Sequence, residues 1–81
     1  MTFSDLLNQA AGDTTNSAIA RATDCKPHTV GKWRARAAVR SLPSRSKVRK
    51  VCEYLGMDFE ATCKVVESEV AANAIAAWRQ T

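Results

Sequence analysis

The stretch from residue 16 to residue 35, NSAIARATDCKPHTVGKWRA, predicts two short helices joined by a tight turn. The linker, residues 24–26, is too short for antiparallel helices, so the two axes must cross steeply. Pro27 predicts the start of the second helix, because proline needs no amide partner in a first turn. The residues expected to face inward are Ile19, Ala20 and Thr23 on the first helix and Val30, Trp33 and Ala37 on the second.

The same stretch resembles the helix-turn-helix of the Cro and lambda-repressor family of phage and bacterial transcription regulators. The resemblance lies in the small residue at Ala20, the short turn after it, and the positions of Val30 and Trp33. The resemblance covers about Thr14 to Met57. It implies a helix-turn-helix over about residues 16–37, with a recognition helix from Pro27 to about Ala37 that enters the major groove of DNA.

Two residues depart from the pattern of that family. Asp24 stands where the family usually has a glycine in a left-handed conformation, which Asp tolerates better than most side chains. Gly31 lies inside the expected recognition helix, where glycine costs roughly 1 kcal/mol of helix stability relative to alanine. This glycine is either simply tolerated, or it lets the backbone come close to a partner.

The charge of the chain is concentrated around the same stretch. The net charge is +4, but residues 21–50 hold ten of the twelve Lys and Arg residues against one acid, Asp24, which gives this block a charge of +9. A basic block centred on a recognition helix is typical of a phosphate-binding face. Double-stranded DNA is therefore the expected partner, and a merely solvated basic surface is the alternative.

Base contacts are expected from the first turns and the outer face of the recognition helix, at Lys26, Pro27, His28, Thr29, Lys32 and Arg36. His28 and Lys32 lie one turn apart and are the first choices. Lysine can donate to O6 and N7 of guanine, and histidine can donate to a purine N7. Thr29 or the ring of Pro27 could contact a thymine methyl group. The family resemblance also implies base contact at Pro27, His28 and Lys32.

Phosphate contacts are expected at Thr15, Asn16, Ser17, Arg34, Arg40, Ser44, Arg45 and Lys47. The first three lie at the start of the helix before the turn, where free backbone amides favour an anion. The family resemblance implies a second phosphate contact at the loop after the recognition helix and at the start of the next helix. The alternative for Thr15, Asn16 and Ser17 is that they are ordinary capping residues.

The whole chain of 81 residues predicts one compact all-α domain of five helices. Outside the central pair, the expected helices are one capped by Thr2 or Ser4 and ended by Gly12, one from Arg45 to Leu55 between Ser44 and Gly56, and a long C-terminal helix over about residues 58–79. Thr15 is the expected cap of the helix that begins near Asn16. Tyr54 is expected to be half-buried.

The predicted C-terminal helix is rich in alanine and contains no glycine or proline. It would be roughly 30 Å long, which is more than the other four helices need as cover. We therefore expect a homodimer, with Val66, Val70, Asn73 and Ala77 at the interface and Asn73 fixing the register. Palindromic DNA sites match two-fold proteins. The alternative is that this stripe closes the core of the monomer.

Other chemistries find less support in the sequence. Cys25 and His28 have the spacing of metal ligands, but Cys52 and Cys63 are too far apart to form the usual second pair of a zinc site. An odd number of cysteines favours free thiols in a reducing compartment. No catalytic triad, acid/base pair or phosphate-binding glycine loop stands out. We expect no enzyme activity, cofactor, metal or small-molecule substrate.

The expected function is that of a sequence-specific, double-stranded DNA-binding transcription regulator, resembling a phage Cro-like or repressor protein. The alternative is a protein-interaction module, such as an antitoxin or a recombination accessory factor, that uses the C-terminal helix. The sequence has no apolar run long enough for a membrane span and no basic leader of a signal peptide. A cytoplasmic location, at the nucleoid of a bacterial host, is therefore expected.

Overall fold

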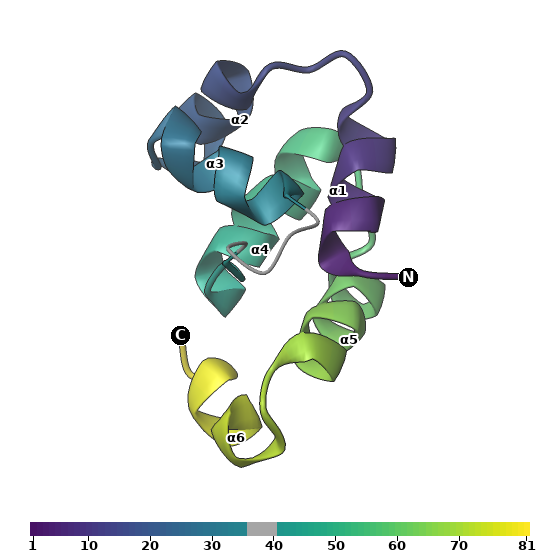
Figure 1. The fold of residues 1–81 in the computed structure, drawn as a ribbon, viewed down its shortest axis with the longest axis vertical. Helices are drawn as coiled ribbons and strands as arrows, with labels where there is room; N and C mark the ends of the chain where they lie inside the picture. The colour runs from purple at the N-terminus through teal and green to yellow at the C-terminus, as the bar shows by residue number, and fades with distance from the viewer. Residues whose placement is uncertain (36–40) are drawn as a thin grey trace.

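The computed structural model describes residues 1–35 and 41–81, and within these ranges it contains helices and no strands. The all-α class is therefore confirmed. The described residues form six α-helices and one short 3-10 helix: α1 (Phe3–Ala11), α2 (Asn16–Thr23), α3 (Pro27–Arg34), α4 (Arg45–Leu55), α5 (Phe59–Glu69), η1 (Ala72–Ala74) and α6 (Ile75–Trp78) (Figure 1). None of these helices is long and apolar enough to cross a lipid bilayer.

The ends of the helices follow the capping signals in the sequence. The side chains of Thr2, Thr15, Ser44 and Asp58 accept hydrogen bonds from backbone amides in the first turns of α1, α2, α4 and α5. At α1 the partner residue Asp5 also accepts from the amide of Thr2, which completes a capping box. Gly56 ends α4 in the left-handed conformation, with φ of 71°.

The core lies between α1, α2, α3, α4 and α5, and one residue of α6 reaches it. Its buried apolar members are Phe3, Leu7, Ala11, Ile19, Ala20, Val30, Trp33, Val48, Val51, Cys52, Cys63, Val66 and Trp78. α1 packs on α3 and α5, while α4 packs on α2 and α5. Tyr54 on α4 is 47% exposed, which agrees with the expectation that it is half-buried, while Val48, Val51 and Cys52 face the core.

The predicted continuous C-terminal helix over residues 58–79 is wrong. α5 ends at Glu69, and Val70 has an extended backbone with φ of −83° and ψ of 141°. The carboxylate of Glu69 accepts a hydrogen bond from the amide of Phe3, which ties the end of α5 to the start of α1. The chain then turns back through η1 and α6 (Figure 1).

Burial of Trp78 explains why the chain turns back after α5. The Trp78 side chain is 9% exposed, and its Nε1 donates a hydrogen bond to the carbonyl of Pro43. A continuous helix would carry Trp78 about 13 Å beyond Glu69 along the helix axis, away from the core. Burying a large aromatic ring with its N–H satisfied is worth more than the few helical hydrogen bonds that are lost at Val70.

Candidate nucleic-acid interface

The turn between α2 and α3 is built around a left-handed residue. Asp24 has φ of 57° and ψ of 47°, and it is the one non-glycine residue with positive φ in the described ranges. The amide of Cys25 donates to the carbonyl of Ala20 at 2.9 Å, which closes the last turn of α2. The expected left-handed conformation at Asp24 is therefore confirmed, and it directs the chain into Pro27 at the first position of α3.

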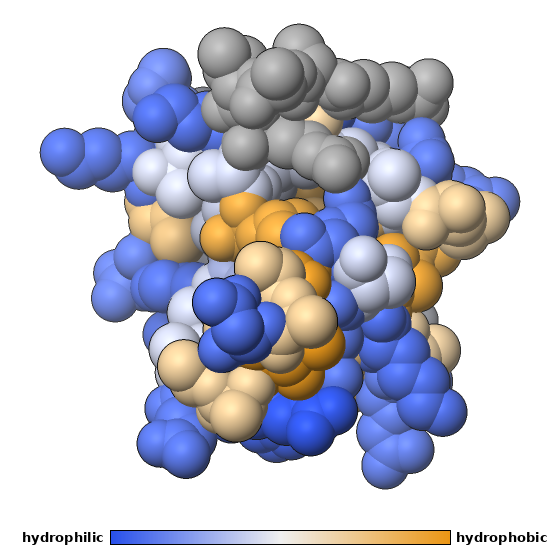
Figure 2. Space-filling view, turned by 60° about the horizontal axis from the view of Figure 1, so that its bottom comes forward, coloured by the Kyte–Doolittle hydropathy of each residue, from blue (hydrophilic) through white to orange (hydrophobic). Residues whose placement is uncertain are grey.

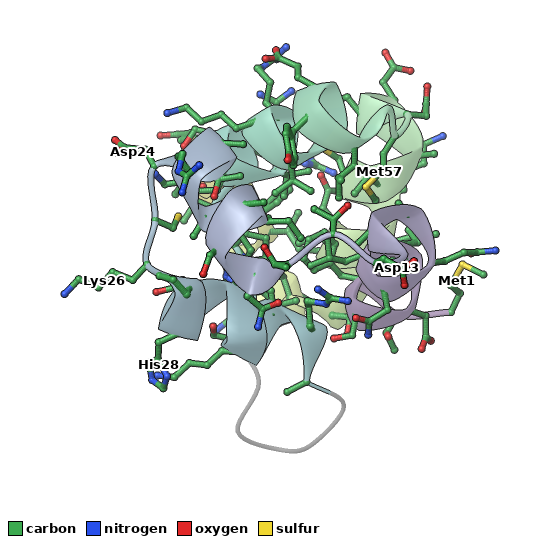
Figure 3. All side chains as sticks on the ribbon, turned by 90° about the horizontal axis from the view of Figure 1, so that it is seen from above. Met1, Asp13, Asp24, Lys26, His28 and Met57 are labelled. Atoms are coloured by element: carbon green, nitrogen blue, oxygen red, sulfur yellow. The ribbon has the colours of Figure 1, made fainter. Side chains whose placement is uncertain are left out.

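α3 has a buried face and an exposed face, as predicted, and the third residue expected to face inward, Ala37, lies outside the described residues. Val30 is fully buried and Trp33 is 3% exposed, whereas Lys26, Pro27, His28 and Lys32 are exposed. Figure 3 shows that Lys26 and His28 extend away from the body of the molecule on the same side. Thr29 is half-buried, and Arg36 lies outside the described residues.

α3 is shorter than predicted, because it ends at Arg34 and the backbone of Ala35 is extended. Polar side chains of α1 bind the carbonyl groups at this end. The hydroxyl oxygen of Ser4 lies 2.7 Å from the carbonyl oxygen of Trp33 and 2.8 Å from that of Ala35. The side-chain amide of Asn8 donates to the carbonyl of Arg34 at 3.1 Å. The single proton of Ser4 can serve the carbonyl of Trp33 or that of Ala35, and Asn8 serves the carbonyl of Arg34, so the end of α3 finds partners on α1.

The side chain of Arg34, a predicted phosphate contact, is bound within the protein. Its Nε donates to Oδ1 of Asn8 at 2.7 Å, and its Nη1 donates to the carbonyl of Thr14 at 3.1 Å and to Oδ1 of Asn16 at 3.0 Å. Asn8 therefore binds both the backbone and the guanidinium of Arg34. Together these bonds join the end of α3 to α1 and to the start of α2.

The start of α2 presents three of the predicted phosphate contacts. Thr15 caps the helix through a hydrogen bond from the amide of Ala18, and its side chain and that of Ser17 are exposed. Asn16 is half-buried and held by Arg34. A Cβ atom added to Gly31 would lie 3.5 Å from Nδ2 of Asn16, so the middle of α3 passes close to the start of α2.

The predicted phosphate contacts at the start of α4 are partly engaged in internal contacts. Nζ of Lys47 donates to the carbonyls of Thr23 and Asp24 at 2.8 and 3.1 Å, which leaves one of its three donors. The guanidinium of Arg45 lies 4.9 Å from the ring centroid of Phe59. Ser44 caps the helix by accepting from the amide of Lys47. Arg40 lies outside the described residues.

The four predicted dimer residues do not share one helical face. Val66 is fully buried in the core of the monomer, and Val70 is half-buried at the break after α5. Asn73 lies in η1 and Ala77 in α6, and both are exposed. The predicted dimer seam along one long helix is therefore wrong, although two of the four residues, Asn73 and Ala77, lie on the surface.

All three cysteine thiols are free. Cys25 is half-buried in the turn before α3, and its Sγ lies 3.4 Å from the carbonyl oxygen of Thr23. Burial raises the pKa of the Cys52 thiol above its ordinary value, and burial likewise raises the pKa of Cys63. Both thiols are therefore poor nucleophiles in the folded protein.

Ser4 and Asn8 are the residues of this site whose role the sequence did not indicate, since Ser4 was expected only as an alternative cap of the first helix, a role that Thr2 takes. They lie 29 and 26 residues from their partners at the end of α3, so no local spacing relates them to it. A serine and an asparagine on an otherwise apolar face of the first helix were the only available signal. Comparisons with protein-family models, with curated proteins and with solved structures found no match for this chain.

Proposed function

We propose that this chain is a sequence-specific, double-stranded DNA-binding transcription regulator that resembles the Cro and lambda-repressor family. The observation that carries the proposal is the division of α3 into two faces. Val30 and Trp33 fix the helix to the core, and His28 and Lys32 are left exposed one turn apart on the outer face. Such a helix can enter the major groove without unfolding any part of the protein.

In this proposal each part of the surface has a distinct role. His28 and Lys32 contact base edges, with Lys26 and Pro27 beside them at the start of α3. Thr15 and Ser17 at the start of α2, and Ser44 at the start of α4, bind phosphates through hydroxyl groups and helix N-terminal amides. Arg34 is reassigned from a phosphate contact to a residue that holds α2 and α3 in position, because its guanidinium is already bound by Asn8, Thr14 and Asn16.

The decisive experiment is a titration with duplex DNA at several salt concentrations, first with random sequence and then with sites selected from a random pool. We expect affinity to fall steeply with salt, because bound phosphates release counterions. In the Lys32→Ala variant, the preference for the selected site over random duplex should fall about tenfold or more, as loss of a base contact predicts.

Lys64→Ala is the matched control, since Lys64 is an exposed lysine on α5 rather than on α3. This variant should keep the preference of the wild type for the selected site. Absence of duplex binding at low salt would overturn the proposal. Binding with equal affinity for all sequences would reduce it to non-specific DNA association.

We further propose that the partner at the other end of the molecule is a second copy of the chain. Residues 70–78 carry no charge, and Ala71, Ala72, Asn73, Ala76 and Ala77 among them are exposed. Figure 2 shows apolar side chains gathered at this end. An uncharged surface matches an identical uncharged surface, because residues 70–78 bring no like charges together at a two-fold interface.

A further inference from the structure

The chain after α5 forms a C-terminal strap, residues 70–81, that folds back onto the start of α4 (Figure 1). Polar contacts attach the far end of the strap to the two residues around the N-cap of α4. Nε1 of Trp78 donates to the carbonyl of Pro43 at 2.9 Å, and the hydroxyl oxygen of Thr81 accepts from the amide of Arg45 at 3.0 Å. The hydroxyl of Thr81 also donates to the carbonyl of Trp78, so the last turn of the strap binds as one unit.

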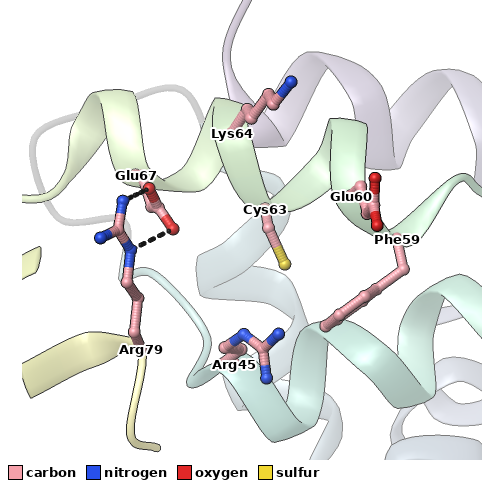
Figure 4. Close-up of a pocket in the computed structure, with 7 residues that line it drawn as sticks. All are labelled: Arg45, Phe59, Glu60, Cys63, Lys64, Glu67 and Arg79. Atoms are coloured by element: carbon pink, nitrogen blue, oxygen red, sulfur yellow. Dashed lines mark hydrogen bonds and ion pairs between the residues drawn. The ribbon is translucent and has the colours of Figure 1, made fainter. Parts of the chain in front are cut away.

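Before this attachment the strap spans a groove. The groove has a volume of about 480 Å³, and residues of α4, α5 and the strap line it, among them Arg45, Phe59, Cys63, Glu67 and Arg79 (Figure 4). Across the groove, Arg79 donates two hydrogen bonds to Glu67, at 2.8 and 3.1 Å, in an exposed ion pair. Trp78 is the one residue of the strap that is buried. The strap is therefore a separable unit, held chiefly by the ring of Trp78 and a few polar contacts.

The bend between α5 and the strap is short, and its sequence favours a helix. Val70 and Ala71 both have extended backbones, with ψ of 141° and 139°. Neither is a glycine or a proline, and alanine has the highest helix propensity of all residues. Among the described residues no group accepts from the amide of Ala71, which in a continued helix would donate to the carbonyl of Glu67. The contacts of the strap therefore maintain the bend against the preference of its own sequence.

We propose that two copies of the chain exchange their straps, so that Trp78 of each copy occupies the site beside Pro43 of the other. The inference rests on the proposed pairing with a second copy and specifies how the two copies bind. When α5 runs on through Val70 and Ala71, it carries Trp78 about 13 Å beyond Glu69 and away from its own Pro43. An identical site is then available on a second copy. Exchange of an identical element is a low-cost route to a dimer, and a short hinge invites it.

The exchange conserves the contacts of the strap, because each is made to the other copy instead of within one chain. The two connecting segments pass each other at the two-fold axis, and residues 70–78 carry no charge, so no like charges meet there. The hinge gains helical hydrogen bonds, and association opposes this gain through the loss of translational and rotational freedom. The closed monomer and the exchanged dimer therefore differ little in their contacts, and protein concentration decides between them.

The ion pair between Arg79 and Glu67 makes the exchange testable, because it lies within one chain in the closed monomer and between two chains after exchange. Two full-length variants are prepared, Glu67→Arg and Arg79→Glu, and each places two like charges across its own groove. In a mixture of the two, exchange pairs Arg79 of one copy with Glu67 of the other, and it also joins the two substituted positions with opposite charges. No arrangement within a single chain of the mixture restores either ion pair.

The two variants are refolded together from urea, and native mass spectrometry counts the dimers that form. We expect the mixed dimer to exceed its statistical share over the two homodimers by at least about threefold, as two restored surface ion pairs predict. A mixture of each variant with the wild type is the matched control, since exchange there restores one ion pair at most. The mixed dimer should therefore exceed its statistical share by less in the control than in the mixture of both variants.

A second variant, Ala71→Pro, tests the hinge. Proline fits the closed strap, because Ala71 has φ of −57°, its amide is unused among the described residues, and Val70 before it is already extended. It cannot continue α5, so the dimer should dissociate at least about tenfold more readily in sedimentation equilibrium. Ala71→Ser, which keeps the amide and the freedom to become helical, should leave the dimer intact. Far-UV circular dichroism checks that the variants are folded.

The outcomes separate the exchange from the other proposals. Statistical mixing of Glu67→Arg with Arg79→Glu would overturn the exchange, as would a dimer that Ala71→Pro leaves unweakened, and pairing through the outer surface of residues 70–78 would then stand. A wild type that stays monomeric at every concentration would overturn both the pairing and the exchange. DNA binding is measured separately by the salt titration, so a failure of the exchange and a failure of the proposed function give different results.

Discussion

Arg34 shows how one side chain can fix the relative position of three helices. It is half-buried at the end of α3, and its guanidinium reaches Asn8 on α1, the carbonyl of Thr14, and Asn16 at the start of α2. A planar guanidinium with several fixed donors suits this task, and the single ammonium of lysine does not.

Replacement of Arg34 by lysine should therefore destabilise the fold. We expect Arg34→Lys to lower the free energy of unfolding by about 1–3 kcal/mol, because polar groups of Asn8, Thr14 and Asn16 lose their partner. Urea denaturation followed by circular dichroism measures this change. Lys32→Ala is the matched control on the same helix, and its exposed side chain should change the free energy by less than about 0.5 kcal/mol. Equal stabilities of the two variants would contradict the structural role of Arg34.

Gly31 offers a second test at the scale of one residue. Its backbone is helical, and an added Cβ atom would meet only the Asn16 side chain, at an ordinary contact distance of 3.5 Å. Gly31→Ala should therefore raise the free energy of unfolding by up to about 1 kcal/mol, through helix propensity. Thermal denaturation measures the change.

The same variant addresses why glycine occupies this position. If the backbone of α3 comes close to DNA at Gly31, the more stable Gly31→Ala protein should bind the selected duplex more weakly. If the glycine is only tolerated, affinity should stay unchanged while stability rises. A loss of stability would show that the contact with Asn16 is tighter than an ordinary van der Waals contact.

Among the helices, most starts and ends were predicted from local signals in the sequence. The helix ends that were not predicted depend on contacts between residues far apart in the sequence. The caps at Thr15 and Ser44 and the stop at Gly56 were predicted because each acts within one turn of its own helix. The early end of α3 was not predicted, because it depends on Ser4 and Asn8 of α1.

The break at Val70 was missed for a related reason. An alanine-rich run without glycine or proline has the local signature of a continuous helix. The favourable burial of Trp78 beside Pro43, 35 residues away, outweighs that local preference. In the candidate site, the exposed face of α3 was predicted from its periodicity, whereas the internal bonds of Arg34 and Lys47 required the three-dimensional arrangement.

The chain after α5, residues 70–81, forms a C-terminal strap that is paired with α5 through a pH-dependent contact between Arg79 and Glu67. Hydrogen bonds from Arg79 lower the pKa of Glu67 below its ordinary value, with a smaller contribution from the charge of Arg45. A carboxylate whose pKa is lower in the folded protein than in the unfolded chain stabilises the folded form at pH values above the pKa of the unfolded chain. This stabilisation is lost as the pH falls through the lower pKa of the folded protein. Acidification into that range should therefore loosen the pairing between the strap and α5.

The indole N–H resonance of Trp78 in a ¹H–¹⁵N NMR spectrum reports this change, because it is bonded to Pro43 in the attached strap. We expect it to shift towards the position of an exposed indole as Glu67 becomes protonated. Glu67→Gln should show the loosened position across the whole pH range. A resonance that moves with pH in the same way in both proteins would assign the transition to another group.

At the scale of the whole molecule, charge and apolar surface are separated between two regions. Two lysines of the basic block, Lys26 and Lys32, are exposed at α3, and the uncharged residues 70–78 lie at the C-terminal end, where Figure 2 shows apolar side chains. Through Trp78 and Thr81 the strap connects these regions, since its outer surface is free and its inner contacts hold the start of α4. A second copy bound to the strap would therefore also stabilise the start of α4.

This arrangement predicts that dimerisation and DNA affinity are lost together when the uncharged surface is charged. Ala76→Glu would bring two carboxylates together at a two-fold interface, so the dimer should dissociate at least about tenfold more readily, because like charges in an interface are costly. Sedimentation equilibrium over a range of protein concentrations measures the change. Ala61→Glu, at an exposed alanine in the first turn of α5, is the matched control and should leave the dimer intact.

A palindromic site offers two half-sites, so even a monomeric protein binds it about twofold more tightly than a single half-site. The Ala76→Glu variant should show only this small gain. The wild type should gain more, because one bound copy brings its dimer partner to the second half-site. A wild type that stays monomeric at every concentration would contradict the proposed interface. Selection of an asymmetric site would have the same consequence, because a single α3 would then account for recognition and residues 70–78 would serve only to carry Trp78 to Pro43.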